Sequence, residues 1–285
     1  MTVTLVCSPR SLPREHWVAA AQRAAEVNPA NYPRLERLVR AVPDFQLTPE
    51  RIAVVTAKYW GLKGVRLTVG FLDNPPKDLR ARILLHMNAW AKRANVTFVA
   101  SNTNPQVRIA RSNVEPAAGY WSYVGTDILS IKADEPTMNL QDFTMQTPES
   151  EFHRVVRHET GHTLGFPHEH MRGELVAKID PDKAIAYFGR TQGWSPAEVR
   201  QQVLTPIEES TIRGTAHADP NSIMCYQIPG TITKDGRPII GGLDIDKEDF
   251  EFMATIYPKT VQSLAPKKST GRTPKKSTGR KPKRR

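Results

Sequence analysis

The sequence predicts an α+β fold with two lobes: a twisted, mostly parallel sheet with two long helices in the N-terminal lobe, and an irregular C-terminal lobe with a final helix. Two observations carry this prediction. Strand-like runs surround a long helical pattern at residues 76–94, and a second helical pattern follows at 152–164. Beyond Gly165 no regular pattern is visible until a last helix, which Asp244 or Asp246 caps.

The first 47 residues are predicted to be an N-terminal extension or a pro-region (1–47). They contain two helical patterns, at 11–25 and 35–42, and no recognisable catalytic motif. A third helix is predicted at 48–60, because a Thr-Pro pair supplies its cap and first turn and a glycine follows it. The main globular domain is therefore expected to cover 48–262.

Three strands are predicted in the N-terminal lobe, where apolar and polar residues alternate. They cover residues 65–71, 96–100 and 107–110. Between 113 and 146 the chain is rich in Gly, Ser and Asp, and short β-like runs near Trp121 and at 128–131 favour edge strands and loops. The final helix is expected to end near Tyr257.

The 285 residues have a formal net charge of +11, but the excess of positive charge lies in a C-terminal tail. Residues 266–285 hold ten Lys and Arg and no acidic residue, which leaves 30 basic and 29 acidic residues elsewhere. The tail repeats PKKSTGR at 266–272 and 274–280 without an apolar residue to bury, so 263–285 is predicted to be disordered in isolation. Its Lys-rich steps resemble histone tails, which makes a polyanion or nucleic acid a candidate partner.

The rest of the composition is that of a globular protein, with enough hydrophobic residues (39%) for a packed core. Cys7 and Cys225 are the only cysteines, so there is no disulfide framework and at most one bridge. The N-terminus lacks the basic start and apolar run of a classical signal peptide, and no stretch approaches the ~18 apolar residues of a membrane span. The expected location is the cytoplasm, or outside the cell by a non-classical route.

Residues 158–168 read HETGHTLGFPH and fit the long zinc-binding pattern H-E-x-x-H-x-x-G-x-x-H. His158 and His162 lie four apart on the predicted helix, so both imidazoles project from one face and can bind one Zn²⁺. Gly165 can adopt the left-handed conformation that ends the helix, which returns His168 as a third ligand. Three protein ligands leave one position for water, which is the arrangement of a catalytic site.

Glu159 follows the first of these histidines and is the predicted general base. A water molecule on zinc has its pKa lowered towards about 7, so it can give its proton to this carboxylate and attack a carbonyl. Glu159 can then pass the proton to the leaving amine. The predicted reaction is the hydrolysis of internal peptide bonds in a protein or peptide substrate, with one catalytic Zn²⁺.

The sequence resembles the astacin-like metzincins, a family of zinc metallopeptidases, at three motifs. These are HETGHTLGFPHEHMR at 158–172, GYWSYVG at 119–125 and SIMCY at 222–226. The resemblance covers most of residues 50–258 and implies a two-lobed zincin fold. It also implies that Met224 forms a turn beneath the zinc and that Tyr226 reaches the metal and stabilises the oxyanion. Substrate is then expected to pair with a sheet edge at 121–124, and the alternative is an ordinary buried aromatic strand.

Several residues depart from the animal members of that family. Glu174 and Leu175 follow Arg172 where astacins usually have Asp and Arg, and the usual disulfide cysteines are absent. The sequence DPNSIM at 219–224 is more similar to microbial relatives. In astacins the residue that matches Glu169 receives the freed N-terminus, and a salt bridge or a helix-end contact is an equal alternative here.

The other histidines and the cysteines are weaker candidates. His170 does not fit the ligand spacing and is predicted to lie behind the ligands or at the surface, and His153 and His217 are expected not to bind metal. Cys225 is expected to be a buried thiol beside the site. Cys7 can be a free thiol, a bridge to Cys225, or a latch that binds the zinc in a zymogen, since a thiolate is a good fourth ligand.

A second class of function competes with the peptidase. In this alternative the chain is a polyanion- or DNA-binding protein. Its basic tail (266–285) binds the partner, and the folded domain is an inactive zincin that serves as a scaffold. Zinc content and peptide cleavage would support the first function, and salt-sensitive retention on DNA the second. Both can hold together, and the sequence determines neither the cleavage specificity nor the oligomeric state.

Overall fold

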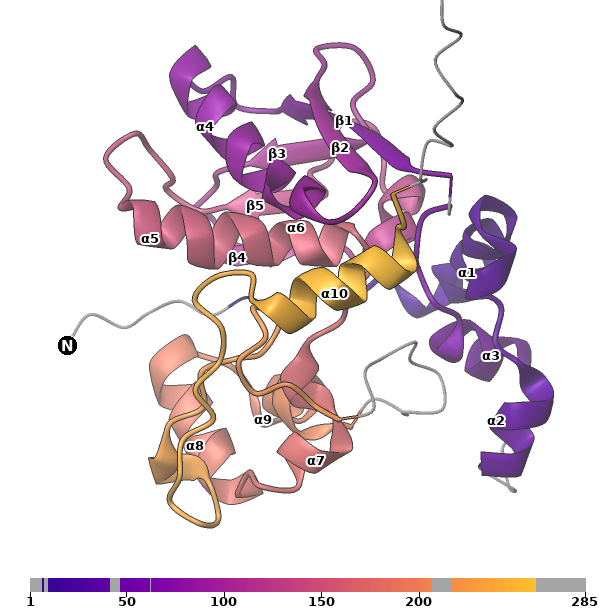
Figure 1. Cartoon of the computed structure of the whole chain (residues 1–285). Coiled ribbons are helices and arrows are strands. Elements are labelled where there is room, and N and C mark those ends of the chain that lie inside the picture. The colour runs from indigo at the N-terminus through magenta and orange to yellow at the C-terminus, as the bar shows by residue number, and fades with distance from the viewer. Residues whose placement is uncertain (1–6, 8–9, 42–46, 62, 207–216, 260–285) are drawn as a thin grey trace, which may run out of the picture.

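The computed structural model describes residues 7, 10–41, 47–61, 63–206 and 217–259, and these residues form two lobes (Figure 1). The N-terminal lobe contains the sheet and the helices that cover it. The C-terminal lobe contains shorter helices and long loops. Two separate clusters of buried apolar residues fill the molecule, the larger one beneath the sheet. The predicted α+β fold with two lobes is confirmed.

The sheet has five strands in the order β2-β1-β3-β5-β4. Their bounds are Val65–Phe71 for β1, Val96–Ala100 for β2, Val107–Ala110 for β3, Tyr120–Ser122 for β4 and Met138–Leu140 for β5. β1 pairs in parallel with β2 and β3, β3 pairs in parallel with β5, and β4 runs antiparallel to β5. The sheet is therefore mostly parallel, as predicted, and β4 lies at its edge.

The segment between β3 and the second long helix differs from the prediction in two places. The β-structure predicted at 128–131 is wrong, because most of these residues lie in a 3-10 helix, Gly125–Ser130. The sequence also gives no signal for β5, whose three residues are all buried. A three-residue strand buried on both faces shows no alternation of apolar and polar residues.

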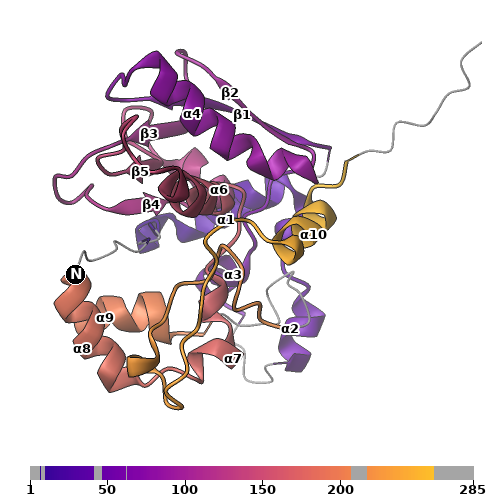
Figure 2. The same cartoon turned by 60° about the vertical axis from the view of Figure 1, so that its left-hand side comes forward.

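Two long helices of the N-terminal lobe pack against each other and against the sheet (Figures 1 and 2). α4 covers Lys77–Met87 and continues as a 3-10 helix over Asn88–Lys92. The second helix, called the histidine helix below, has three consecutive parts: α5 (Glu149–Glu151), a π-helical segment (Phe152–Val156) and α6 (Arg157–Thr163). Phe152 and Val156 are buried in one core with Leu79 and Ile83 of α4. Both predicted helices are confirmed.

The N-terminal extension packs onto the domain that follows it. Its elements are a 3-10 helix at Arg14–His16, α1 at Trp17–Val27, a 3-10 helix at Pro29–Asn31 and α2 at Leu35–Ala41, and α3 follows at Pro49–Val55. Ala20 and Ala24 of α1 are buried, and the Asn31 side chain makes two hydrogen bonds with the backbone of Tyr59, of 2.7 and 3.0 Å. Residues on the two sides of the boundary expected at residue 48 are therefore in contact, while the boundary itself stays a prediction.

The helix predicted at 48–60 is shorter than expected, because α3 ends at Val55. Beyond it the backbone turns, and the N–H of Ala57 donates to the carbonyl of Asn31 at 3.0 Å. The tail at 263–285 lies outside the described residues. In the part of the chain that is described, no helix has the length and the apolar character to cross a bilayer.

The C-terminal lobe is more helical than predicted. It contains α7 (Gly173–Val176), α8 (Pro181–Gln192), α9 (Pro196–Val199), a π-helical segment (Arg200–Leu204), a 3-10 helix (Gly230–Ile232) and α10 (Lys247–Ile256). Asp180 caps α8 by accepting from the N–H of Lys183 at 3.2 Å, and Gly193 ends it with a φ of 72°. Asp246 caps the final helix, as one of the two predicted candidates, and Asp249 completes a capping box with it.

Candidate active site

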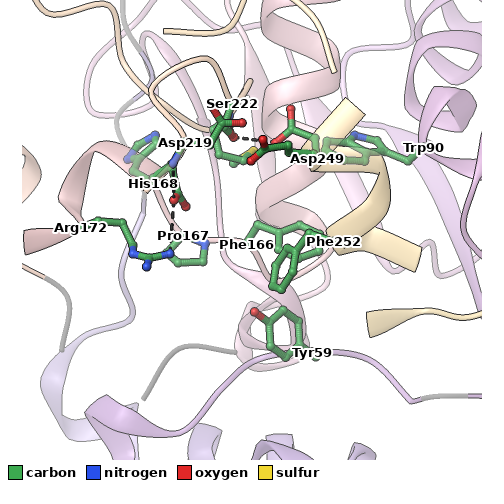
Figure 3. A pocket seen from close by; sticks show the side chains of 13 residues that line it. Tyr59, Trp90, Phe166, Pro167, His168, Arg172, Asp219, Ser222, Asp249 and Phe252 are labelled. Carbon is green, nitrogen blue, oxygen red and sulfur yellow. Dashed lines mark hydrogen bonds and ion pairs between the residues drawn. The ribbon is translucent and has the colours of Figure 1, made fainter. Parts of the chain in front are cut away.

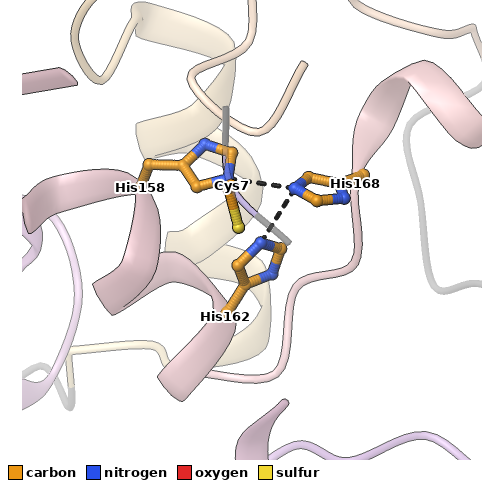
Figure 4. A group of neighbouring side chains, drawn as sticks. All are labelled: Cys7, His158, His162 and His168. Atoms are coloured by element: carbon orange, nitrogen blue, oxygen red, sulfur yellow. Dashed lines mark hydrogen bonds between the residues drawn. The ribbon is translucent and has the colours of Figure 1, made fainter. Parts of the chain in front are cut away.

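Three histidines meet between the lobes (Figure 4). His158 and His162 come from one face of α6, and His168 follows a turn at Gly165, whose φ of 101° is the left-handed conformation predicted for it. Nε2 of His168 lies 3.1 Å from Nε2 of His158 and 3.0 Å from Nε2 of His162. All three side chains are buried. The structure thus brings together the three residues predicted as metal ligands.

The outer nitrogens of two of these rings are held by backbone carbonyl groups. Nδ1 of His158 lies 2.5 Å from the oxygen of Ile223, and Nδ1 of His162 lies 2.7 Å from that of Phe166, so each Nδ1 carries a proton. The Nε2 lone pairs of both rings therefore point towards His168. Tetrahedral zinc with bonds of about 2.0–2.1 Å separates two ligand nitrogens by about 3.3 Å, close to the spacing here. The donors present fit a zinc ion.

Burial keeps these imidazoles neutral. Desolvation lowers the pKa of His162 to about 4. Desolvation, together with the neighbouring histidines, holds the pKa values of His158 and His168 well below the usual range. A neutral imidazole is the form that binds a metal ion, so the site has its ligands ready near neutral pH.

The carboxyl group of Glu159 lies beside the histidines and is 1% exposed. Burial raises its pKa to about 8, while the thiol of Cys7 and the guanidinium of Arg154 lower it. Oε2 accepts from Sγ of Cys7 at 3.4 Å, and Oε1 has no hydrogen-bond partner within the described residues. A bound cation would favour the charged form, which is a proton acceptor. The sequence gives no indication of Arg154, although it lies one helical turn before His158.

A turn at residues 222–226 lies beneath the histidines. Sδ of Met224 packs so closely on α6 that a Cβ on Gly161 would overlap it. The hydroxyl of Ser222 and the next backbone N–H donate to the carboxylate of Asp249 at 2.6 and 2.9 Å. α10 therefore anchors the turn, and Met224 lies under the site as the family resemblance implies.

Tyr226 belongs to a stack of rings on the other side of the site. Its ring centroid lies 4.3 Å from that of His168 and 3.9 Å from that of His170. His170 is fully buried, and its Nε2 lies 2.9 Å from the carbonyl of Gln202. Of the two places predicted for His170 the surface is wrong, because this ring supports Tyr226 from behind. The Tyr226 hydroxyl donates to the carbonyl of Cys7.

Glu169 forms a salt bridge, which is one of the three roles predicted for it. Its Oε1 lies 3.4 Å from Nη1 of Arg172 and accepts from the N–H of Asp219 at 3.1 Å. A small pocket lies beside this pair (Figure 3). Aromatic and charged side chains share its wall: Tyr59, Trp90, Phe166, Phe252, His168, Glu169, Arg172, Asp219 and Asp249.

Cys7 lies over the histidines although it belongs to the N-terminal extension (Figure 4). Its Sγ and the ligand nitrogens of the three histidines all lie within 4.8 Å of one another. Cys7 and Cys225 are both buried and both free, so a bridge between them is ruled out. Of the alternatives predicted for Cys7, the free thiol and the latch remain.

A groove of about 720 Å³ runs past the site, and residues of both lobes form its walls. Tyr120, Arg154 and Glu159 line it on the sheet side, and Tyr187 and Ile240 line it on the other. β4 is the edge strand on this side, as expected for the segment near Trp121. Cys7 and Arg10 form isolated parallel bridges with Tyr120 and Tyr123 along this edge, so an extended segment can pair there.

A second cluster of potential ligands, His86, Glu149 and His153, is an ion-pair network. Nε2 of His86 lies 3.1 Å from Glu149, which also pairs with Arg82 at 2.6 Å. Nε of Arg157 donates to Nδ1 of His86 at 3.4 Å, and its Nη2 lies 3.2 Å from His153. Two guanidinium groups beside the cluster disfavour a cation there.

Comparisons with known proteins identify the family. The model of the astacin peptidase family matches residues 56–186. Zinc metalloproteinase nas-27 of Caenorhabditis elegans is 33% identical over 197 residues, or 68% of this chain, and the chain spans only 40% of that relative's length. Two solved structures of myroilysin are 31% identical, with TM-scores of 0.66 and 0.54, and the matches cover 72% and 71% of this chain and 97% and 86% of theirs. The chain belongs to the astacin family of zinc metallopeptidases.

Proposed function

We propose that the protein is a zinc-dependent endopeptidase in which His158, His162 and His168 hold one zinc ion and Glu159 is the general base. One observation carries the proposal: three buried, neutral imidazoles converge through their Nε2 atoms beside a buried carboxyl group with an unpartnered oxygen. Membership of the astacin family supports the same activity.

His158, His162 and His168 would hold the zinc ion, which would supply a water molecule of lowered pKa and a charge that polarises a peptide carbonyl. Glu159 accepts a proton from the attacking water at its carboxylate and delivers it to the nitrogen of the leaving amine. Burial raises the pKa of this carboxyl group to about 8, and the charge of a bound cation would lower it, so the carboxylate would be available to accept the proton.

The hydroxyl of Tyr226 stabilises the oxyanion that forms from the scissile carbonyl. It already donates to a backbone carbonyl, that of Cys7, at the edge of the histidine cluster. Burial raises the pKa of this phenol well above its usual value, so the hydroxyl keeps its proton and remains a donor. A donor that acts on the transition state is worth about 2.7–4 kcal/mol.

The substrate lies extended in the groove and adds a strand to the edge of β4. Such pairing uses main-chain hydrogen bonds, which any sequence supplies, while the groove walls select side chains. Because residues of both lobes line the groove and Glu159 lies in its wall, internal peptide bonds of an extended chain are the expected targets.

The test replaces Glu159 by Gln, which keeps the size of the side chain and removes the base. We expect zinc to stay near one ion per chain and peptide cleavage to fall by about 10²–10⁴-fold. Glu174→Gln is the matched control, since Glu174 is exposed at the surface of the other lobe, and it should cleave like the unchanged chain. Each variant is also assayed with Cys7→Ala, because Sγ lies against this carboxyl group. Undiminished cleavage by Glu159→Gln in both backgrounds would contradict the mechanism.

A second activity, compatible with the first, is polyanion binding by the tail. The charge distribution favours it, because ten cations lie in residues 266–285 and the rest of the chain is almost neutral. Clustered Lys and Arg displace counterions from nucleic acid, so such binding needs no folded site.

A further inference from the structure

We propose that Ile240 is a specificity-determining residue, which forms one side of a subsite for a large apolar side chain of the substrate. The subsite rests on the proposed function, because it acts on a peptide that is held beside Glu159. Ile240 is 64% exposed, and it lies in the wall of the same groove as Glu159. A large apolar side chain is thus presented to whatever lies in the groove.

The wall around Ile240 is apolar and belongs to the C-terminal lobe. Tyr187 of α8, Pro229 and Pro238 line the groove together with Ile228. Ile228 is 1% exposed and is part of the core of this lobe, so the wall is the edge of a packed core. A substrate that covers Ile240 removes apolar surface from water, which favours an apolar side chain there and disfavours a charged one.

The segment that carries Ile240 is held in place on both sides. Ile239 pairs with Ile228 through two backbone hydrogen bonds of 2.9 Å. The Ile239 side chain is buried in the core, so the next side chain along the segment points to the opposite side. Gly241 adopts a φ of 67° and packs on the end of the turn at 222–226, where a Cβ would lie 2.8 Å from backbone atoms. Because this backbone is already fixed, substrate binding does not have to order it.

The cations of the groove are weaker candidates for selecting a side chain. The guanidinium of Arg154 is already paired with Glu151 by two hydrogen bonds of 3.0 and 2.6 Å. Among the described residues of the groove wall, the other Arg or Lys is Arg190, which is exposed, so salt screens its charge. Selection of acidic side chains by these two cations is the competing outcome of the test.

The test compares the cleavage of a mixed peptide library by zinc-loaded full chains, with the cleavage sites read by mass spectrometry. We expect the unchanged chain to favour Leu, Ile, Met or Phe at one position near the scissile bond. In Ile240→Asp the preference for Leu over Lys at that position should fall by about tenfold or more, because a carboxylate replaces the apolar surface. Leu243→Asp is the matched control and should keep the preference, since Leu243 is 59% exposed and is not among the described residues that line the groove. Each chain is also assayed with Cys7→Ala, because Cys7 lies in the same groove wall.

A binding measurement separates the subsite from the peptidase. Zinc-loaded Glu159→Gln chains, with and without Ile240→Asp, are titrated with a fluorescent peptide that has Leu at alternate positions, and with its counterpart that has Ser there. We expect the Leu peptide to bind about tenfold more tightly than the Ser peptide, and this ratio should fall in Ile240→Asp.

The two measurements distinguish the possible failures. A library profile that is the same in Ile240→Asp, including a preference for acidic side chains that persists there, would overturn the subsite while leaving the peptidase intact. No cleavage by any chain, with binding of the Leu peptide that depends on Ile240, would refute the peptidase and retain the subsite.

Discussion

The hydroxyl of Tyr226 owes its position to the rings around it. The phenol ring lies almost parallel to His170, at 18°, and His170 is itself fixed by the carbonyl of Gln202. His168, a proposed ligand, contacts the other part of the ring. The aromatic stack therefore sets where the hydroxyl points, and the hydroxyl contributes only its hydrogen bond.

Replacement of Tyr226 by Phe should accordingly remove one donor and keep the stack. Measured in the Cys7→Ala chain, which lacks the thiol beside Glu159, kcat should fall by about 10²–10³-fold with KM nearly unchanged, because the donor acts on the transition state. Zinc content should stay at one ion per chain. Steady-state kinetics decide the matter, and a raised KM at constant kcat would assign the hydroxyl to substrate binding instead.

At the level of single residues, the sequence predicts what is local. His158, Glu159, His162 and His168 lie within eleven consecutive residues, so helix geometry and one glycine turn are enough to bring them together. The sequence suggests a latch as one role for Cys7 but does not predict its position beside Glu159, because the two residues are 152 positions apart in the chain. Only the packing of the extension across β4 creates that contact.

The end of the histidine helix is tied to two other elements by one tyrosine. Tyr257, immediately after α10, is fully buried. Its hydroxyl donates to the carbonyl of Leu164 at 2.5 Å and accepts from the N–H of Trp60 at 3.0 Å. The indole of Trp60 in turn donates to the carbonyl of Thr163 at 2.9 Å. These bonds satisfy carbonyl groups at the C-terminus of α6, just before the glycine turn that leads to His168.

Tyr257→Phe should therefore destabilise the fold although it removes a single oxygen. Both hydrogen bonds are lost, and two buried backbone groups lose these partners, which costs about 1–3 kcal/mol of the free energy of unfolding. Tyr32→Phe, at a side chain that is 49% exposed, is the control and should change it by less than about 0.5 kcal/mol. Denaturant unfolding at a fixed zinc concentration gives both values, and equal effects would show that the Tyr257 hydroxyl is not needed.

At the level of elements, the sequence predicts the two long helices of the N-terminal lobe. It misses the short strand β5 and the helix α8. The helices at 76–94 and 152–164 have enough turns for their period to be visible. α8 could have been predicted from Asp180 and Gly193, because both cap signals are present in the sequence. β5 could not, since its pairing partners are more than 15 residues away in the chain and its own three residues carry no pattern.

For the molecule as a whole, the metal site is also a connection between lobes. His162 lies on α6 in the N-terminal lobe, whereas His168 follows the turn that leads into the C-terminal lobe. Ligands that converge from two lobes make metal binding part of the folding free energy. Zinc at 100 times its Kd would add about 2.7 kcal/mol.

Chelation of zinc should therefore lower Tm of the unchanged chain by several degrees. The difference between zinc-loaded and chelated samples should largely vanish in His168→Ala, because one of the ligands is gone. The difference should remain in His217→Ala, because His217 is not a proposed ligand and its side chain is 87% exposed. Thermal unfolding of the three chains with and without chelator measures this, and a full zinc-dependent shift in His168→Ala would remove His168 from the ligand set.

The tail and the folded part of the chain differ in charge, and this difference predicts how the two can be separated. Without residues 266–285 the remaining 30 basic and 29 acidic residues nearly cancel, so almost all long-range attraction to a polyanion must come from the tail. Binding by several cations weakens by about 0.9 of a logarithmic unit per neutralised phosphate for each tenfold increase in salt on duplex DNA.

Deletion of residues 266–285 should consequently leave zinc content and the cleavage of a neutral peptide almost unchanged, while retention on DNA or heparin is lost. A chain of equal length whose tail cations are replaced by Ser and Gly is the matched control, because it keeps the length and removes the charge. The unchanged chain should elute last, and the difference in elution between it and both variants should shrink as the salt concentration rises. Co-elution of all three at low salt would refute a binding role for the tail. Loss of peptide cleavage on truncation, with cleavage kept by the uncharged control, would instead make the tail part of the peptidase.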